Sequence, residues 1–401
     1  MEKRIIYLDN AATTPMDSEV LESMLPFMRE QYGNPSAIYS MGSSAKKAVN
    51  QAKRRIAAIL NAKQEEIFFT AGGTEADNWA LKMVMETYRY KGRHLITTAI
   101  EHHAILHTCR YLETQGVEVT YLGVDEDGVI DLEELKQAIR PDTVLISVMF
   151  ANNEVGTVEP IREIGEIARE RGILFHTDAV QAFGQVPIDT EEMHIDLLSA
   201  SGHKINGPKG VGFLYIRSGL ELHSMLHGGA QESGRRAGTE NVPGIAGMAV
   251  AAQKAADNMK TKGAAEMKLR DYLIDRIERE IPYCRLNGHR TKRLPGNVNF
   301  SFRFIQGESL VLMLDRKGIC ASSGSACTSG ELNPSHVLLA LGRNEEEAEG
   351  ALRITLSEKN SMEEMEFVVE CLKEAVQKLR SISTQYTDFC RKNPKTLTEE
   401  I

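Results

Sequence analysis

The sequence lacks cysteine pairs, long apolar runs and basic clusters, and each absence excludes a class of protein. Its six cysteines are scattered over 401 residues without a CxxC pair, which argues against a disulfide scaffold and against a zinc site. No apolar run approaches the roughly 20 residues that a membrane span needs. A net charge of -9 and the lack of a Lys/Arg run argue against a nucleic-acid-binding surface.

A secretory signal is also not visible at the start of the sequence. The first residues, MEKRIIYLDNAATTP, carry charges but no apolar stretch of signal-peptide length. We therefore expect a cytoplasmic protein that binds neither a membrane nor nucleic acid, and we expect no metal site.

The hydrophobic content of 42% is enough for one large core and a smaller one. Between residues 15 and 255, helix-like segments alternate with short strand-like runs rich in β-branched and aromatic residues. This alternation predicts an α/β fold with a mostly parallel, seven-stranded sheet, whose strands gather ligands at their carboxyl ends. The strand-like runs are residues 67–69, 94–97, 117–121, 144–150, 173–176, 197–200 and 211–215.

The pattern changes after residue 255. A charge-rich helical stretch at 260–280 leads into shorter strand-like and helical segments, which is typical of a compact α+β domain. We predict a large domain at 15–255 and a small domain formed by 1–14 and 256–384. The remaining residues, 385–401, are polar, and we expect them to fray as a tail.

An acid and a lysine follow two neighbouring predicted strands. Asp178 lies in HTDAVQ and Lys204 lies in SASGHK, just beyond an apolar strand. Alone, Asp178 could be a turn or capping residue, and most lysines are solvated surface charges. Together they suit pyridoxal 5′-phosphate (PLP), which needs an amine for its Schiff base and a carboxylate beside its ring nitrogen.

A site for the phosphate of this cofactor is also present. FFTAGGTEADN (68–78) predicts a strand, a turn of small residues, and a helix that begins near Thr74. Backbone N–H groups at a helix start bind a dianion, although a Gly-Gly turn alone is weak evidence. Ser201 and His203, beside Lys204, could add phosphate contacts.

Three further polar residues follow predicted strands. His102, in AIEHHAIL, could stack on the pyridine ring and relay protons, or it could simply cap a helix. Asn153, in FANNEVG, and Gln181 could meet the phenolic oxygen of the ring. Five predicted strands are thus each followed by polar groups, and the roles of these groups complement one another.

Cys327 and Arg353 complete the candidate site. Cys327 lies in GICASSGSACTSGELNPSHV, a segment rich in Ser and Gly, where an exposed thiol suits nucleophilic attack better than a buried structural role. Arg353, in LRITL, could clamp a substrate carboxylate with both arms of its guanidinium, or it could form a surface ion pair.

At this point the motifs resemble a known family. The chain is similar to the cysteine desulfurases of the NifS/IscS-like group, within the class V aminotransferase-like PLP enzymes. The resemblance covers nearly the whole chain in order and is carried by YLDNAATTP, GNPSA, TAGGTEADN, EHHAIL, NNEVG, HTDAVQAFG, SASGHKINGPKG, RRAGTEN, SSGSACTSG and LRITLS.

The resemblance implies a homodimeric, fold-type I PLP-dependent transferase. It implies that Lys204 forms the Schiff base, that Asp178 pairs with the pyridinium and that His102 stacks on the ring. Asn153 and Gln181 match residues near the ring hydroxyl. Phosphate contacts are implied for Gly73, Thr74, Ser201 and His203, and for Thr239 of the partner subunit.

The resemblance also implies the substrate contacts and the reaction. Arg353, Asn34 and Asn153 match residues that contact the substrate, L-cysteine. The enzyme converts L-cysteine to L-alanine and leaves the sulfur as a persulfide on Cys327, in a segment that resembles the long-loop group. A sulfur-acceptor protein then receives it for iron–sulfur cluster assembly or thiolation.

Three alternatives compete with this interpretation. One is another PLP activity, such as selenocysteine lyase or an aminotransferase, although transamination has no use for the Cys327 thiol. A second is a non-catalytic scaffold, against which the retention of Lys204 and Cys327 argues. The third is a nucleotide-binding module, which the absence of a GxGxxG or P-loop pattern disfavours.

Overall fold

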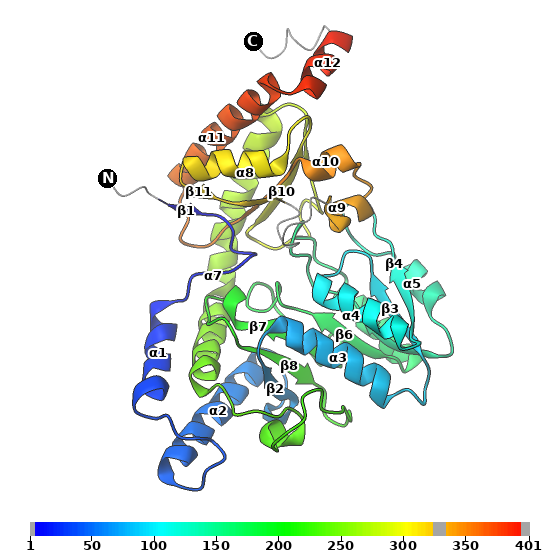
Figure 1. The fold of residues 1–401 in the computed structure, drawn as a ribbon, viewed down its shortest axis with the longest axis vertical. Helices are drawn as coiled ribbons and strands as arrows, with labels where there is room; N and C mark the ends of the chain where they lie inside the picture. The colour runs from blue at the N-terminus through cyan, green and yellow to red at the C-terminus, as the bar shows by residue number, and fades with distance from the viewer. Residues whose placement is uncertain (1–4, 324–333, 394–401) are drawn as a thin grey trace.

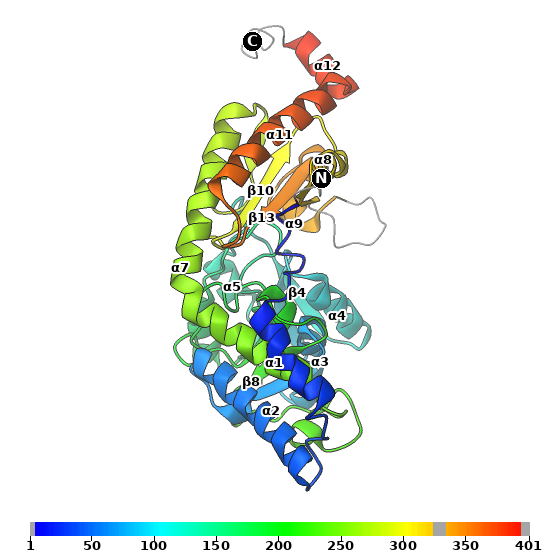
Figure 2. The same ribbon diagram turned by 90° about the vertical axis from the view of Figure 1, so that its left-hand side faces the viewer.

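A computed structural model describes residues 5–323 and 334–393 of the chain. Two lobes lie along the long axis of the molecule, and helix α7 (Val242–Glu280) runs through both (Figures 1 and 2). At 1.5 Å per residue its 39 residues extend about 58 Å. Within the described residues, the helices are too short or too polar to cross a membrane.

The large lobe is built on the predicted seven-stranded sheet. The strand order is β2-β8-β7-β6-β5-β3-β4, and β8 alone runs opposite to the other six strands. The α/β, mostly parallel prediction is therefore confirmed. The strands are β2 (Ile67–Thr70), β3 (His94–Thr98), β4 (Glu118–Leu122), β5 (Thr143–Ser147), β6 (Leu174–Asp178), β7 (Leu197–Ser201) and β8 (Gly212–Ile216).

Helices cover both faces of this sheet. One core joins the sheet to the helices on one face, where Val49, Ala52 and Ile56 form the buried side of α2. A second core lies under α3 and α4 on the other face and contains Trp79 and Ile105. The helices of this lobe are α1 (Ser18–Arg29), α2 (Ser40–Ile59), α3 (Gly73–Thr87), α4 (His103–Thr114), α5 (Leu132–Ala138) and α6 (Ile161–Arg171).

The small lobe has its own sheet and core. Strands β12 (Ser322–Ser323), β13 (Ala351–Thr355), β10 (Asn297–Phe302) and β9 (Cys284–Leu286) pair antiparallel in that order. The N-terminal β1 (Ile6–Tyr7) pairs in parallel with β11 (Ile319–Cys320). The other helices are α8 (Gly307–Arg316), α9 (His336–Ala340), α10 (Glu345–Glu349), α11 (Met362–Ser381) and α12 (Thr384–Lys392).

Helix α7 crosses the residue at which we placed the domain boundary. Ala255 belongs to the core of the large lobe, and Leu269 belongs to the core of the small lobe. The division at 255 therefore stays a proposal: it separates two cores but falls inside one continuous helix.

The expectation that the chain frays from residue 385 is wrong for its described part. Residues 385–392 lie in α12, whose start is capped by the Ser383 side chain. The rings of Tyr386 and Phe389 pack against Phe304, with centroids 5.5 and 4.8 Å away. Two aromatic side chains in an otherwise polar stretch are enough to dock this helix on the small lobe.

Candidate active site

A cavity of about 340 Å³ lies at the carboxyl ends of the central strands. Arg353 on β13 of the small lobe lines it, as do Ala11 and Ala12 of the N-terminal segment. This is the edge at which an open parallel sheet collects its ligands. Ten of the predicted site residues line it: Gly73, Thr74, His102, Asn153, Asp178, Gln181, Ser201, His203, Lys204 and Arg353.

Asp178 and Lys204 both line this cavity, Asp178 at the end of β6 and Lys204 just after the adjacent strand β7. Asp178 ends β6, is buried, and accepts a hydrogen bond from Val180 N at 2.9 Å. Burial raises the pKa of Asp178 to about 6, and the charge of Lys204 opposes that rise. Lys204 ends the short helix η2 (Gly202–Lys204) and is partly buried, so it is not the solvated surface charge of the alternative interpretation.

The N-terminal segment forms a wall of the cavity that the sequence reasoning missed. Lys204 Nζ donates to Ala11 O and, at 2.8 Å, to Ala12 O. Gln181 Nε2 also donates to Ala11 O, at 2.9 Å. Thr14 is tied to the carbonyl of His203 through its backbone N and its hydroxyl. The motif YLDNAATTP, which contains Ala11, Ala12 and Thr14, is the sequence feature from which this wall could have been predicted.

The predicted phosphate turn has the geometry of an anion site. Helix α3 begins at Gly73, and Gly72 before it has φ 153°, a conformation that favours glycine. The first N–H groups of a helix have no intrahelical partner, so they are available to a bound anion. His203 lies beside this turn, and burial lowers its pKa to about 4, which keeps its ring neutral.

His102 is a helix cap, as one of the two interpretations held, and it also lines the cavity. It is the N-cap of α4, where its Nδ1 accepts a hydrogen bond from Ala104 N at 3.1 Å. Burial lowers the pKa of His102 to about 4, and the charge of Lys204 adds to that shift. A neutral ring that accepts at Nδ1 must carry its proton on Nε2.

Arg353 is buried rather than at the surface, with 3% of its area exposed. Its Nη2 pairs with Asp9 Oδ1 at 2.9 Å, and its Nη1 donates to Asn153 O at 3.0 Å. Its Nε has no hydrogen-bond partner among the described residues. Arg353 therefore forms an ion pair with an acid, as one interpretation held, but its side chain is buried and not at the surface.

Two predicted residues do not line this cavity, and a third cannot be placed. Asn34 is exposed between α1 and α2, where its side chain accepts from Ser36 N at 2.9 Å. Thr239 lines a separate cavity of about 170 Å³, next to Gly210 and Arg236. Cys327 lies outside the described residues.

Asp77 is a cavity residue that sequence reasoning missed. It is 1% exposed, and its Oδ1 has no hydrogen-bond partner within 5–323 and 334–393. His176 Nε2 lies 3.8 Å from that oxygen, and burial together with the charge of Asp178 raises the pKa of Asp77 well above its ordinary value. Its position between Ala76 and Ala80, on the buried face of α3, was a usable signal.

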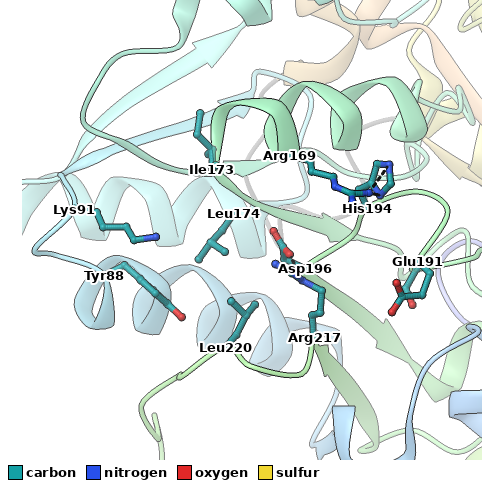
Figure 3. Close-up of a pocket in the computed structure, with 12 residues that line it drawn as sticks. Tyr88, Lys91, Arg169, Ile173, Leu174, Glu191, His194, Asp196, Arg217 and Leu220 are labelled. Carbon is teal, nitrogen blue, oxygen red and sulfur yellow. Dashed lines mark hydrogen bonds and ion pairs between the residues drawn. The ribbon is translucent and has the colours of Figure 1, made fainter.

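A second cavity of similar size, about 320 Å³, lies at the opposite edge of the sheet (Figure 3). Among its lining residues, Arg217 Nε contacts Asp196 Oδ1 at 2.5 Å, and Arg169 Nη1 lies 2.9 Å from His194 Nδ1. None of the predicted site residues lines it. The first cavity is therefore the candidate active site.

Comparisons with known proteins agree with this choice. The family model "Aminotransferase class-V" matches residues 6–368. "Cysteine desulfurase IscS" of Methanosarcina thermophila is 55% identical over 95% of this chain and 94% of its own length. A solved structure of a NifS-like protein has 39% identity and a TM-score of 0.88, covering 93% of this chain and all of that one. "SspA in complex with cysteine" has 38% identity and a TM-score of 0.78, covering 88% and 99%.

Proposed function

The chain belongs to the class V aminotransferase family and is a PLP-dependent cysteine desulfurase, and we propose that cofactor and L-cysteine bind in the cavity at the carboxyl edge of its large sheet. The single observation that carries this assignment is that Lys204 and Asp178 line one cavity with the start of α3. No other cavity described above combines an amine, a buried carboxyl and a helix N-terminus.

The residues around the cavity fit the cofactor. Asp178 is a buried carboxyl whose pKa is raised by burial, although the charge of Lys204 opposes the rise, and a protonated ring nitrogen would supply a cation to pair with it. The start of α3, with Gly73 and Thr74, would hold the phosphate together with Ser201 and His203. Lys204 would hold the aldehyde carbon, and Gln181 and Asn153 would face the ring oxygen. PLP supplies an electron sink for the carbanion at the substrate Cα.

Three side chains are proposed to handle the substrate. Lys204 Nζ acts as the base for the Cα proton, because Lys204 lines the cavity and an amine there can accept a proton from bound substrate. His102 presents its Nε2–H to the cavity and can donate or relay a proton. Arg353 binds the substrate carboxylate, which would take the place of Asp9 or share the guanidinium with it.

The sulfur step is assigned to Cys327. Its thiolate attacks the substrate sulfur, an S–S bond forms, and the C–S bond breaks. The electron pair of that bond stays with carbon, which takes a proton, so that alanine leaves and a persulfide remains on Cys327. The sulfur atoms are oxidised and the carbon is reduced by the same two electrons, so no further oxidant is needed.

The assembly and the partners are also proposals. We propose a homodimer in which Thr239 contacts the phosphate of the partner's cofactor, since Thr239 lies outside the cavity of its own chain. Asn34 is proposed to reach bound substrate. The acceptor is proposed to be a cytoplasmic sulfur-acceptor protein, such as an iron–sulfur scaffold or a thiolation protein.

The test compares the parent protein with Cys327→Ala. Both should show the absorbance of bound PLP near 420 nm, but only the parent should release alanine and sulfide from cysteine in the presence of a thiol reductant. Full sulfide release by the variant would exclude Cys327 as the nucleophile and favour a direct lyase. A colourless Lys204→Ala protein, with a coloured Lys209→Ala control, would identify the cofactor lysine.

A further inference from the structure

Lys204 also lines a second, much smaller cavity. This space of about 40 Å³ is bounded by Gln181, Thr355, Lys262 and Glu266, and it is distinct from the candidate active site. A water molecule needs about 10–15 Å³ of such volume and two or more polar partners. The small cavity therefore has the size and the lining to hold water beside the catalytic lysine.

Glu266 is the acid of this cavity. It lies in the middle of α7, and only 1% of it is exposed, which is unusual for a glutamate. Burial raises the pKa of Glu266 to about 7, and the nearby charge of Lys262 opposes that rise. A carboxyl with a pKa near the working pH can both give and accept a proton.

A chain of ionisable groups connects Glu266 to the surface. Lys262 Nζ lies 3.8 Å from Glu266 Oε1 and 3.6 Å from Glu358 Oε2. The exposed fraction of these side chains increases outward, from 2% for Glu266 to 11% for Lys262 and 45% for Glu358. Glu266 thus lines the small cavity on one side and is linked through Lys262 to the more exposed Glu358 on the other.

The reaction requires proton movement at Lys204. The base takes a proton from the substrate Cα, and the product carries a C–H bond at the carbon that carried sulfur. These protons must be exchanged with solvent, and Lys204 lines both the substrate cavity and the small cavity that holds Glu266.

We propose that Glu266 is a proton-relay residue that connects Lys204 to solvent through the small cavity, with Lys262 and Glu358 as the outer end of the route. The proposal rests on the proposed function of Lys204 as the base. Glu266 does not touch the substrate cavity, so its removal should leave cofactor and substrate binding intact.

The test measures how fast the α-hydrogen of L-alanine, the reaction product, exchanges with D₂O on the PLP-loaded enzyme. This exchange needs Lys204 and its contact with solvent, but no sulfur chemistry. We expect Glu266→Gln to slow the exchange at least about tenfold, within the range of acid–base catalysts. The absorbance of bound PLP and the apparent affinity for alanine should not change.

Two controls separate a relay from a structural role. Glu278 lies on the same helix as Glu266 but pairs with Arg290 on the surface. The Glu278→Gln variant should therefore exchange the α-hydrogen of alanine at the parent rate. Glu266→Ala should be as slow as Glu266→Gln, and added formate, a small carboxylate that fits the vacated space, should restore part of the rate. A purely structural role would not be rescued by formate.

A third measurement needs no cofactor. Infrared difference spectra of the cofactor-free protein should show a buried carboxyl that titrates near pH 7 and disappears in Glu266→Gln. Parent-like exchange in Glu266→Gln would overturn the relay, while absence of exchange in the parent itself would overturn the proposed function of Lys204 instead.

Discussion

Val180 Cγ2 occupies the place where residue 73 would carry a Cβ: an atom built there on Gly73 would lie 2.5 Å from it. Gly73 is the first residue of α3, and Val180 follows Asp178 by two positions. Both line the candidate active site. The phosphate turn and the segment after the ring-nitrogen partner are therefore packed against each other, and the glycine is what allows it.

Gly73→Ala should accordingly weaken both folding and cofactor binding. The added methyl must displace Val180 or the start of α3, and overpacking of this kind costs about 1–3 kcal/mol. Denaturant titration and PLP titration of the cofactor-free protein measure the two effects. Val180→Ala should restore most of both in the double variant, with a coupling of more than about 0.5 kcal/mol. Additive losses in the double variant would contradict the contact.

The sequence predicted the sheet and most of the site because their signals are local. Each strand was a short β-branched or aromatic run, and Asp178 and Lys204 followed such runs directly. The first half of α7 was not predicted: its small apolar residues pack on several sides, so a one-sided apolar period is missing.

Other features depended on tertiary contacts that no local pattern encodes. Asp77 and Glu266 are acids inside helices, and only the packing of α3 on the sheet and of α7 beside the small cavity buries them. Likewise, α12 contacts the small lobe through the rings of Phe389 and Phe304, which are far apart in the sequence. The role of Cys327 stays a prediction from sequence.

Substitution of His102 should separate its role as the cap of α4 from its proposed role in the reaction. Asn is a strong N-cap, so His102→Asn should keep the cap on α4 while removing the imidazole from the cavity. We expect turnover to fall about 10²–10⁴-fold, the usual contribution of an acid–base group. Thermal unfolding should stay near the parent, whereas His102→Ala should lose about 1 kcal/mol more. Equal turnover of the parent and His102→Asn would leave only the capping role.

Arg353→Lys should raise the KM for L-cysteine with little change in the PLP absorbance. A lysine keeps the charge but loses the two-armed geometry, and a charge-assisted hydrogen bond contributes about 1.5–3 kcal/mol, or roughly 10–100-fold in affinity. Steady-state kinetics over a range of cysteine concentrations provides the measurement. Arg285→Lys, at an exposed pair with Glu126, is the matched control and should behave as the parent. An unchanged KM in Arg353→Lys would show that the carboxylate of L-cysteine does not bind to Arg353.

The buried carboxyls predict how the stability of the cofactor-free protein depends on pH. Burial raises the pKa of Glu154 to about 7 and that of Glu159 to about 8, above the ordinary 4.5. The folded state therefore keeps protons that the unfolded state releases, and the free energy of unfolding falls as pH rises from about 4.5 to 8. The lowered pKa values of His102 and His203 act in the opposite direction, but only below their ordinary 6.5.

The window between pH 6.5 and 8 consequently isolates the carboxyls. There the free energy of unfolding should fall with pH, with a slope of at most about 1.4 kcal/mol per pH unit for each such group. Glu159→Gln keeps an acceptor for Ile130 N but carries no titrating proton, so the slope of this variant should be smaller. Urea titrations at closely spaced pH values measure both proteins, and Glu163→Gln on the exposed side of α6 is the control. A parent protein whose stability is flat or rising across this window would show that these carboxyls are ionised in the fold.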